Sequence, residues 1–227
     1  MDRGILDSGN DAADRLQVGT DAADFSNCDL VIEAVPEMWD LKVSSLRMIE
    51  NSVAPGTLIA SNTSSLSVSK LADELDEGSR FLGMHFFNPV PSSELIEIIV
   101  GEDTSPDAVT EVLQWSRALG KVPIVARDIP GFASSRLGAA LALEAMRMVE
   151  EGVASAEDID TAMVLGYKHA TGPLRTTDIV GLDVRLGIAR YLESTLGERF
   201  APPQILIDKV EKGELGRKAG KGFYDWG

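Results

Sequence analysis

The sequence contains two histidines, and one of them, His85, lies in the apolar run FLGMHFF (81–87). Glu97 interrupts a second apolar run, LIEIIV (95–100). The two residues are equally far from Pro91, so a reversal of the chain in NPVPSS would place them opposite each other on neighbouring strands. A carboxylate beside an imidazole orients the ring and stabilises its charged form, which suits proton transfer. The alternative is a packed strand histidine and a glutamate that points to solvent at a sheet edge.

Asn62 and Ser64 are further candidates, because ASNTSSL (60–66) follows the apolar strand pattern GTLIASN (56–62). In open α/β sheets, ligands bind at the carboxyl ends of the strands. Helix capping is the simpler role for these hydroxyl groups. Glu37 follows the strand pattern DLVIEAV (29–35) and could accept a hydrogen bond from a ribose hydroxyl, or could be a solvated loop acid.

Two lysines could neutralise an anion. Lys42 could pair with a phosphate or extend along a helix face, and Lys218 lies in the Gly-rich segment GRKAGKGFY (216–224), which could also be a mobile tail. The dinucleotide fingerprint G-x-G-x-x-G does not occur in the sequence, whose only G-x-G is GKG (220–222). His169 is expected to be structural and Cys28 to belong to the core.

The order of the elements predicts two regions. Up to about Asp128, short β-branched runs alternate with helical patterns at 38–53, 67–76 and 106–120, which favours an α/β sheet with parallel pairs. The expected strands cover 29–35, 56–62, 81–87, 95–100 and 121–127. After DIPG (128–131) only helices are expected, at 135–151, from a cap at Ser155 to Gly166, at 178–196 and at 203–212. The predicted domains are residues 1–127 and 128–227.

Composition narrows the possible functions. The net charge of −15 argues against a nucleic-acid partner, because a phosphate backbone requires a basic surface. The single cysteine rules out an intrachain disulfide, and no metal site is expected. No apolar window is long enough for a membrane span and the first residues lack the pattern of a signal peptide, so a cytoplasmic protein is expected.

Seven segments together resemble the L-3-hydroxyacyl-CoA dehydrogenases, particularly the bacterial 3-hydroxybutyryl-CoA type. In the family's order they are DLVIEAVPE, ASNTSSL, HFFNPVP with LIEII, DIPGF, EEGVASAEDIDTAM, TDIVGLD and GRKAGKGFYDW. The resemblance extends from about Arg15 over nearly the whole chain and favours the catalytic role of His85.

The resemblance implies NAD-dependent oxidation of (S)-3-hydroxyacyl-CoA to 3-oxoacyl-CoA, as in fatty-acid β-oxidation. His85 is expected to take the proton of the 3-hydroxyl, with Glu97 orienting the ring. Ser64, Asn88 and Ser135 would contact substrate or cofactor. The expected NAD-binding residues are Glu37, Lys42, Asn62, Ser64, Asn88 and Lys218. The helical half would form a homodimer and one wall of the acyl-CoA cleft.

Three departures from the family pattern affect these expectations. The Gly-rich βαβ unit is absent, so a truncated doubly wound (Rossmann-like) sheet is expected before the all-helical domain. Ser135 stands where the family has an asparagine, and HATGP (169–173) replaces the usual Pro-Met-Gly-Pro. One alternative is a catalytically silent fragment that only dimerises, and a weaker one is dehydrogenation of a sugar acid. The incomplete sheet is also expected to aggregate or to self-associate.

Overall fold

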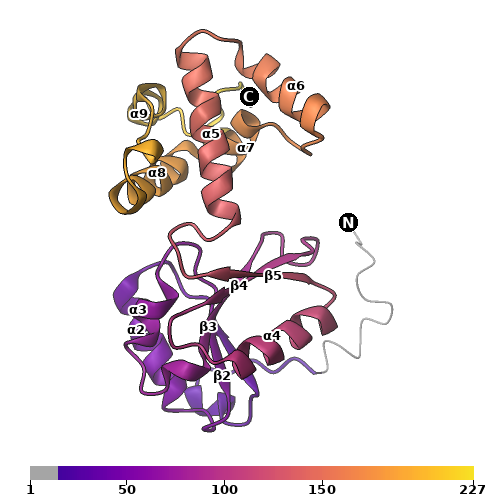
Figure 1. Cartoon of the computed structure of the whole chain (residues 1–227), viewed down its shortest axis with the longest axis vertical. Helices are drawn as coiled ribbons and strands as arrows, with labels where there is room; N and C mark the ends of the chain where they lie inside the picture. The colour runs from indigo at the N-terminus through magenta and orange to yellow at the C-terminus, as the bar shows by residue number, and fades with distance from the viewer. Residues whose placement is uncertain (1–14) are drawn as a thin grey trace.

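A computed structural model describes residues 15–227, so residues 1–14 of the expected first domain lie outside the described part. The described chain forms a sheet domain followed by a helical domain (Figure 1). The strands are β1 (Leu30–Glu33), β2 (Leu58–Ser61), β3 (Phe81–Phe86), β4 (Leu95–Val100) and β5 (Val122–Arg127). The helices of the sheet domain are α2 (Trp39–Glu50), α3 (Val68–Ala72) and α4 (Pro106–Ala118), with short 3₁₀ turns η1 (Ala22–Phe25) and η2 (Gly78–Arg80).

All five expected strands are present, and they lie in the order β1-β2-β3-β4-β5. The pairs β1–β2, β2–β3 and β4–β5 are parallel, whereas β3 and β4 are antiparallel. This single reversal follows from the short connection between β3 and β4, since a parallel pair needs a long crossover. The sheet is therefore a mixed one, with the polar residues that follow β1 and β2 at the same edge.

Helices cover both faces of the sheet (Figure 1). On one face α2 and α3 pack against the strands through a buried cluster that includes Leu46, Leu71 and Phe81. On the other face, Ala108 and Val112 of α4 pack in a cluster with buried residues of β2, β3 and β4. Helix α4 is followed by Gly120 at φ 73°, which confirms the predicted helix stop.

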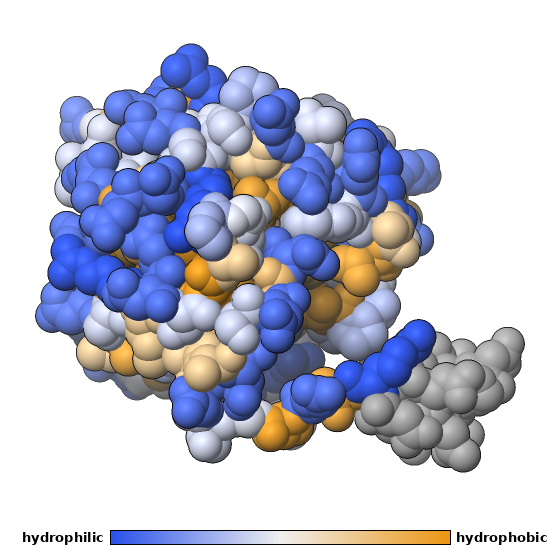
Figure 2. Space-filling model, turned by 90° about the horizontal axis from the view of Figure 1, so that it is seen from below, coloured by the Kyte–Doolittle hydropathy of each residue, from blue (hydrophilic) through white to orange (hydrophobic). Residues whose placement is uncertain are grey.

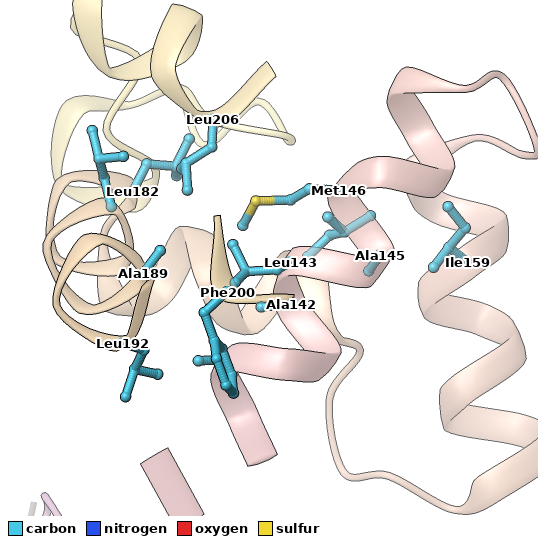
Figure 3. Close-up of a cluster of buried hydrophobic side chains, with 13 residues drawn as sticks. Ala142, Leu143, Ala145, Met146, Ile159, Leu182, Ala189, Leu192, Phe200 and Leu206 are labelled. Carbon is cyan, nitrogen blue, oxygen red and sulfur yellow. The ribbon is translucent and has the colours of Figure 1, made fainter. Parts of the chain in front are cut away.

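The second domain consists of α5 (Ser134–Glu150), α6 (Ala156–Tyr167), α7 (Pro173–Val180), α8 (Leu182–Leu196) and α9 (Gln204–Glu211), with η3 (Glu198–Phe200) and η4 (Arg217–Ala219). The long helix α5 rises from the sheet domain, with α8 and α9 on one side and α6 on the other (Figure 1). Its apolar face, including Leu143 and Met146, packs against Leu182, Ala189 and Leu206 (Figure 3).

Several of the predicted helix boundaries were wrong. The helices expected at 38–53 and 67–76 end earlier, at Glu50 and Ala72. The single helix expected at 178–196 is two helices, because Gly181 has φ 107°, a conformation that interrupts helical hydrogen bonding and that glycine tolerates. The helix that opens at Ser155 continues past Gly166 to Tyr167 and ends with Lys168 in the left-handed conformation. Ser155 accepts a hydrogen bond from the backbone N–H of Asp158, as predicted for the cap.

The carboxyl-terminal segment is attached to the helical domain by Asp178. This buried carboxylate accepts hydrogen bonds from the backbone N–H groups of Phe223 and Tyr224 and from the indole N–H of Trp226. The guanidinium of Arg175 lies 4.3 Å from the centre of the Tyr224 ring. The segment GKGFYDW is thus packed in the described structure, in contrast to the mobile-tail alternative.

The face of the molecule seen from below is mostly hydrophilic, with small apolar patches between the hydrophilic residues (Figure 2). No helix within residues 15–227 combines the length and apolar character needed to cross a bilayer.

Candidate active site

His85 and Glu97 are direct partners in the antiparallel register of β3 and β4. The Nδ1 atom of His85 lies 2.7 Å from Oε2 of Glu97, and both side chains are buried. A carboxylate at this distance favours the tautomer that carries its proton on Nδ1, which leaves the Nε2 lone pair available as a base. The second ring nitrogen makes no hydrogen bond within residues 15–227. The chain reversal proposed from the sequence is confirmed, and the two side chains face each other.

The amino-terminal end of α5 holds Glu97 in its charged form. Oε1 accepts hydrogen bonds from the backbone N–H groups of Ala133 (3.2 Å) and Ser134 (2.9 Å), and Oε2 accepts one from the Ser134 hydroxyl (2.8 Å). Burial alone would raise the pKa of Glu97, but the hydrogen bonds from His85 and Ser134 outweigh burial and lower this pKa below its usual value. Glu97 is therefore a stable anion beside the imidazole.

Two aromatic side chains restrict the His85 ring. The centre of the Phe87 ring lies 4.6 Å from the centre of the imidazole, and that of Phe132 lies 5.9 Å away. Phe132 is buried and has φ 48°, a conformation that is unusual for a non-glycine residue. The hydrogen bond to Glu97 and these two contacts fix the direction of Nε2.

Glu37 organises the loop that follows β2. Its Oε1 atom accepts hydrogen bonds from the Thr63 hydroxyl (2.6 Å) and from the backbone N–H groups of Ser64 and Ser65 (3.0 Å each). Partial burial would raise the pKa of Glu37, but the Thr63 hydrogen bond, the charge of Lys42 and the bonds from Ser65 and Ser64 lower it below its usual value. The Ser64 hydroxyl makes no hydrogen bond within the described residues, so it is free to bind a ligand.

Lys42 lies behind Glu37 and has no exposed surface. Its ammonium group is 2.8 Å from Oε1 of Glu33 and 3.3 Å from Oε2 of Glu37. Glu33 is also buried, and its Oε2 accepts a hydrogen bond from the Ser61 hydroxyl at 2.6 Å. A buried lysine is tolerated only when its charge is compensated, and two carboxylates provide that compensation here. A direct contact between Lys42 and a cofactor stays a prediction.

A cavity of about 620 Å³ separates the sheet domain from the helical domain. One wall contains Glu37, Asn62 and Ser64 from the loops after β1 and β2. The facing wall contains residues of α8, and Ser135 of α5 lies between the walls. Asn62 also accepts a hydrogen bond from the backbone N–H of Phe86, which ties this wall to the end of β3, one residue from His85.

The remaining sequence candidates lie elsewhere. Asn88 is exposed in the loop after β3 and is not among the residues that line the cavity. Lys218 forms an ion pair with Asp183 at 2.6 Å, in which both side chains are largely exposed. This pair lies at the first turn of α8, next to Val184 of the cavity wall. Residues 15–227 contain no group of His, Cys, Asp and Glu side chains suited to a metal ion.

Three functional residues were not identified from the sequence. Ser134, rather than its neighbour Ser135, donates hydrogen bonds to Glu97. A signal for this role was available in the sequence, because a buried carboxylate requires hydrogen-bond donors. Glu33 interrupts the apolar run DLVIEAV just as Glu97 interrupts LIEIIV. The sequence could therefore have indicated that Glu33 is a buried carboxylate that requires a partner. Phe132 carried no signal in the sequence, because its contact with His85 depends on the path of the chain after β5.

These features together define a dehydrogenase of the two-domain, dinucleotide-binding class. The sheet carries polar residues at the ends of its strands, a helical domain closes the cavity, and a His–Glu pair can transfer a proton. Residues 3–129 match the family model of the 3-hydroxyacyl-CoA dehydrogenase NAD binding domain, and residues 131–226 match that of the 3-hydroxyacyl-CoA dehydrogenase C-terminal domain. The chain belongs to the 3-hydroxyacyl-CoA dehydrogenase family, and its cofactor is NAD.

Individual relatives agree with this assignment. A probable 3-hydroxybutyryl-CoA dehydrogenase of Deinococcus radiodurans is 40% identical over 223 residues, which are 98% of this chain and 80% of that protein. The mitochondrial hydroxyacyl-coenzyme A dehydrogenase of Sus scrofa is 37% identical over 93% of this chain and 68% of its own length. The crystal structure of (S)-3-hydroxybutyryl-CoA dehydrogenase from Ralstonia eutropha superposes with a TM-score of 0.92 and 40% identity, over 95% of this chain and 77% of that one.

The cavity residues fit the nicotinamide–ribose end of NAD. The Glu37 side chain is 35% exposed and can accept from a ribose hydroxyl, and Asn62 and Ser64 offer an amide and a hydroxyl beside it. The turn between β1 and α2, residues 34–38, contains no glycine and carries a glutamate, so it does not resemble a pyrophosphate-binding turn. The fit is therefore to the reactive end of the cofactor.

Proposed function

We propose that the chain catalyses the NAD-dependent oxidation of (S)-3-hydroxyacyl-CoA to 3-oxoacyl-CoA and the reverse reduction. The observation that carries the proposal is the buried 2.7 Å pair of His85 and Glu97, whose free Nε2 can accept a proton. The family membership of both domains supports the reaction class.

The chemistry divides between the protein and its cofactor. In oxidation, Nε2 of His85 accepts the proton of the 3-hydroxyl group, and the resulting imidazolium is stabilised by the Glu97 carboxylate. Bound NAD would supply the acceptor for the hydride, that is, the hydrogen on C3 with the two electrons of its C–H bond. In reduction, His85 returns the proton to the oxygen on C3.

Hydroxyl groups are proposed to hold the reacting oxygen. The Ser64 hydroxyl is free and lines the cavity, and Ser135 lies next to Ser134, which binds Glu97. A serine at 135 has a shorter reach than the asparagine of the family pattern, so we assign it a weaker contact. Asn88 is proposed to approach the substrate from the loop after His85.

The cofactor contacts follow the same surface. We assign Glu37 and Asn62 to the ribose and nicotinamide, with Lys42 acting through Glu37 because it is fully buried. Lys218 is assigned to the entrance of the cavity, where its partner Asp183 adjoins Val184.

A catalytically silent protein that retains only the fold and its self-association is the second candidate. The observation in its favour is the lack of G-x-G-x-x-G in the sequence, since this loop holds the pyrophosphate in dinucleotide-binding sheets. The two candidates differ in cofactor binding and in turnover.

The deciding experiment is a titration of the chain with NADH, followed by fluorescence or calorimetry, together with an assay of acetoacetyl-CoA reduction. Binding with turnover would support the dehydrogenase. A folded sample that neither binds NADH nor turns over would support the silent protein.

A homodimer through the helical domain is also proposed. Six large apolar side chains of this domain are at least 40% exposed on three of its helices: Leu137 and Leu141 of α5, Leu165 and Tyr167 of α6, and Ile179 and Val180 of α7. Exposed apolar side chains gathered on one surface favour association, and we propose that these six form such a surface. Sedimentation of the wild type and of Leu141→Lys tests this, and a wild-type monomer would refute it. A cytoplasmic site of action and a role in fatty-acid oxidation complete the proposal.

A further inference from the structure

One face of α8 forms the helical wall of the cavity. The residues on this face are Val184, the pair Gly187 and Ile188, and the pair Tyr191 and Leu192. Successive groups are three or four positions apart and so share one side of the helix. All of them except Gly187 present a large side chain. Gly187 is therefore a gap in the middle of an otherwise continuous wall.

The helix itself gains nothing from this glycine. Gly187 lies inside α8 (Leu182–Leu196), where glycine is among the least favourable residues. Its backbone does not have the positive φ that would require glycine, and a Cβ atom placed on it would meet no heavy atom within 4 Å. Gly187 is exposed and lines the cavity, so a side chain at this position would extend into open space beside the cavity.

The two walls of the cavity differ in polarity. The sheet side offers the polar groups of Glu37, Asn62 and Ser64 beside the apolar Ala34, Val35 and Leu66. The α8 side offers Tyr191 and the aliphatic groups of Val184, Ile188 and Leu192, and no charged side chain. An acyl thioester has the same division, since its oxygens lie near the reacting carbon and its tail is pure hydrocarbon. The tail can leave water by lying along α8, and apolar burial stabilises that arrangement.

We propose that Gly187 determines the acyl-chain length that the cavity accepts, because its missing side chain leaves room along α8 for chains longer than four carbons. This inference rests on the proposed function, since it concerns the acyl-CoA substrate of the same site. Gly187 is a specificity-determining residue and takes no part in proton transfer.

The test is calorimetric binding of two CoA thioesters, acetoacetyl-CoA and 3-oxooctanoyl-CoA, to the wild type and to Gly187→Ala, Gly187→Val and Gly187→Leu. The quantity compared is the ratio of the two dissociation constants, which does not depend on the active fraction of a sample. Each methylene group removed from water strengthens binding by roughly fourfold. Loss of contact for three or four methylenes in Gly187→Leu should therefore shift the ratio against the longer chain by roughly sixtyfold or more.

Ala118→Leu is the control, because Ala118 is exposed near the end of α4 and does not line the cavity. A shift that grows from Ala to Val to Leu at position 187 and is absent in the control supports the proposal. Wild-type binding of both thioesters with an unchanged ratio in all Gly187 variants would overturn the role of Gly187 and leave the proposed function intact. If the wild type binds neither thioester, the proposed function fails, and the inference fails with it.

Discussion

The carboxylate of Glu97 binds the first turn of α5 through Ser134 and binds the ring of His85 at the same time. Glu97 lies on β4 and Ser134 begins the first helix of the second domain. One buried side chain therefore joins the acid–base residue to the junction of the two domains. A change in how α5 meets the sheet would alter the donors of Glu97 and, through them, the orientation of the imidazole.

Removing the imidazole should abolish most of the activity. We expect His85→Ala to lower kcat for acetoacetyl-CoA reduction roughly 10²–10⁴-fold, the range typical of general acid–base groups. Glu97→Gln should lower kcat by a smaller factor, because an amide can still hold the ring but does not stabilise its charge. Glu94→Gln, at an exposed position next to the start of the same strand, is the control. Unchanged turnover of His85→Ala would contradict the assignment.

The stability contributed by Glu97 should depend on pH in a defined direction. Its pKa in the folded protein lies below its ordinary value of 4.5, so the folded state favours the charged form. The resulting stabilisation is fully present above the ordinary pKa and is lost as the pH falls through the lowered one. Urea unfolding of the wild type and of Glu97→Gln should show a constant difference in the free energy of unfolding above about pH 5, and a shrinking difference below it. A difference that grows in acid would refute this interpretation.

Breaking the buried ion pair should destabilise the sheet domain. Lys42→Met leaves the buried Glu33 carboxylate without its cation, which is expected to cost about 3–5 kcal/mol in the free energy of unfolding. The double variant Glu33→Leu/Lys42→Met removes both charges and should recover part of this loss. Urea denaturation measures both quantities. A single variant as stable as the wild type would show that Lys42 is not essential to the packing of this domain.

Asp178 should contribute more to stability than Asp183, although each aspartate has a defined partner. Asp178→Ala removes the buried acceptor of three donors in the final segment. Because hydrogen bonds to a charged group are stronger than those between neutral groups, we expect the free energy of unfolding to fall by about 3 kcal/mol. Asp183→Asn breaks an exposed ion pair with Lys218 and should change the free energy of unfolding by less than about 1 kcal/mol. Denaturation of the two variants under the same conditions tests the ranking, which equal losses would contradict.

The sequence patterns were sufficient to place the strands, and the spacing around Pro91 offered His85 and Glu97 as a possible pair. That spacing left open a packed histidine with a glutamate that points to solvent, and only the family resemblance favoured the pair. The order of strand and helix patterns likewise predicted the helical second domain. The break at Gly181 was not predicted, because helical periodicity continues across it and only the backbone conformation reveals it.

The donors to Glu97, the burial of Lys42 and the composition of the cavity were decided by the tertiary structure. Each depends on contacts between segments far apart in the chain, such as Glu97 with Ser134 or Glu37 with Ser64. The role of Ser134 rather than Ser135 depends on which of two adjacent hydroxyls the first turn of α5 directs toward β4. Local sequence patterns report the spacing within one element, whereas these choices depend on how two elements meet in space.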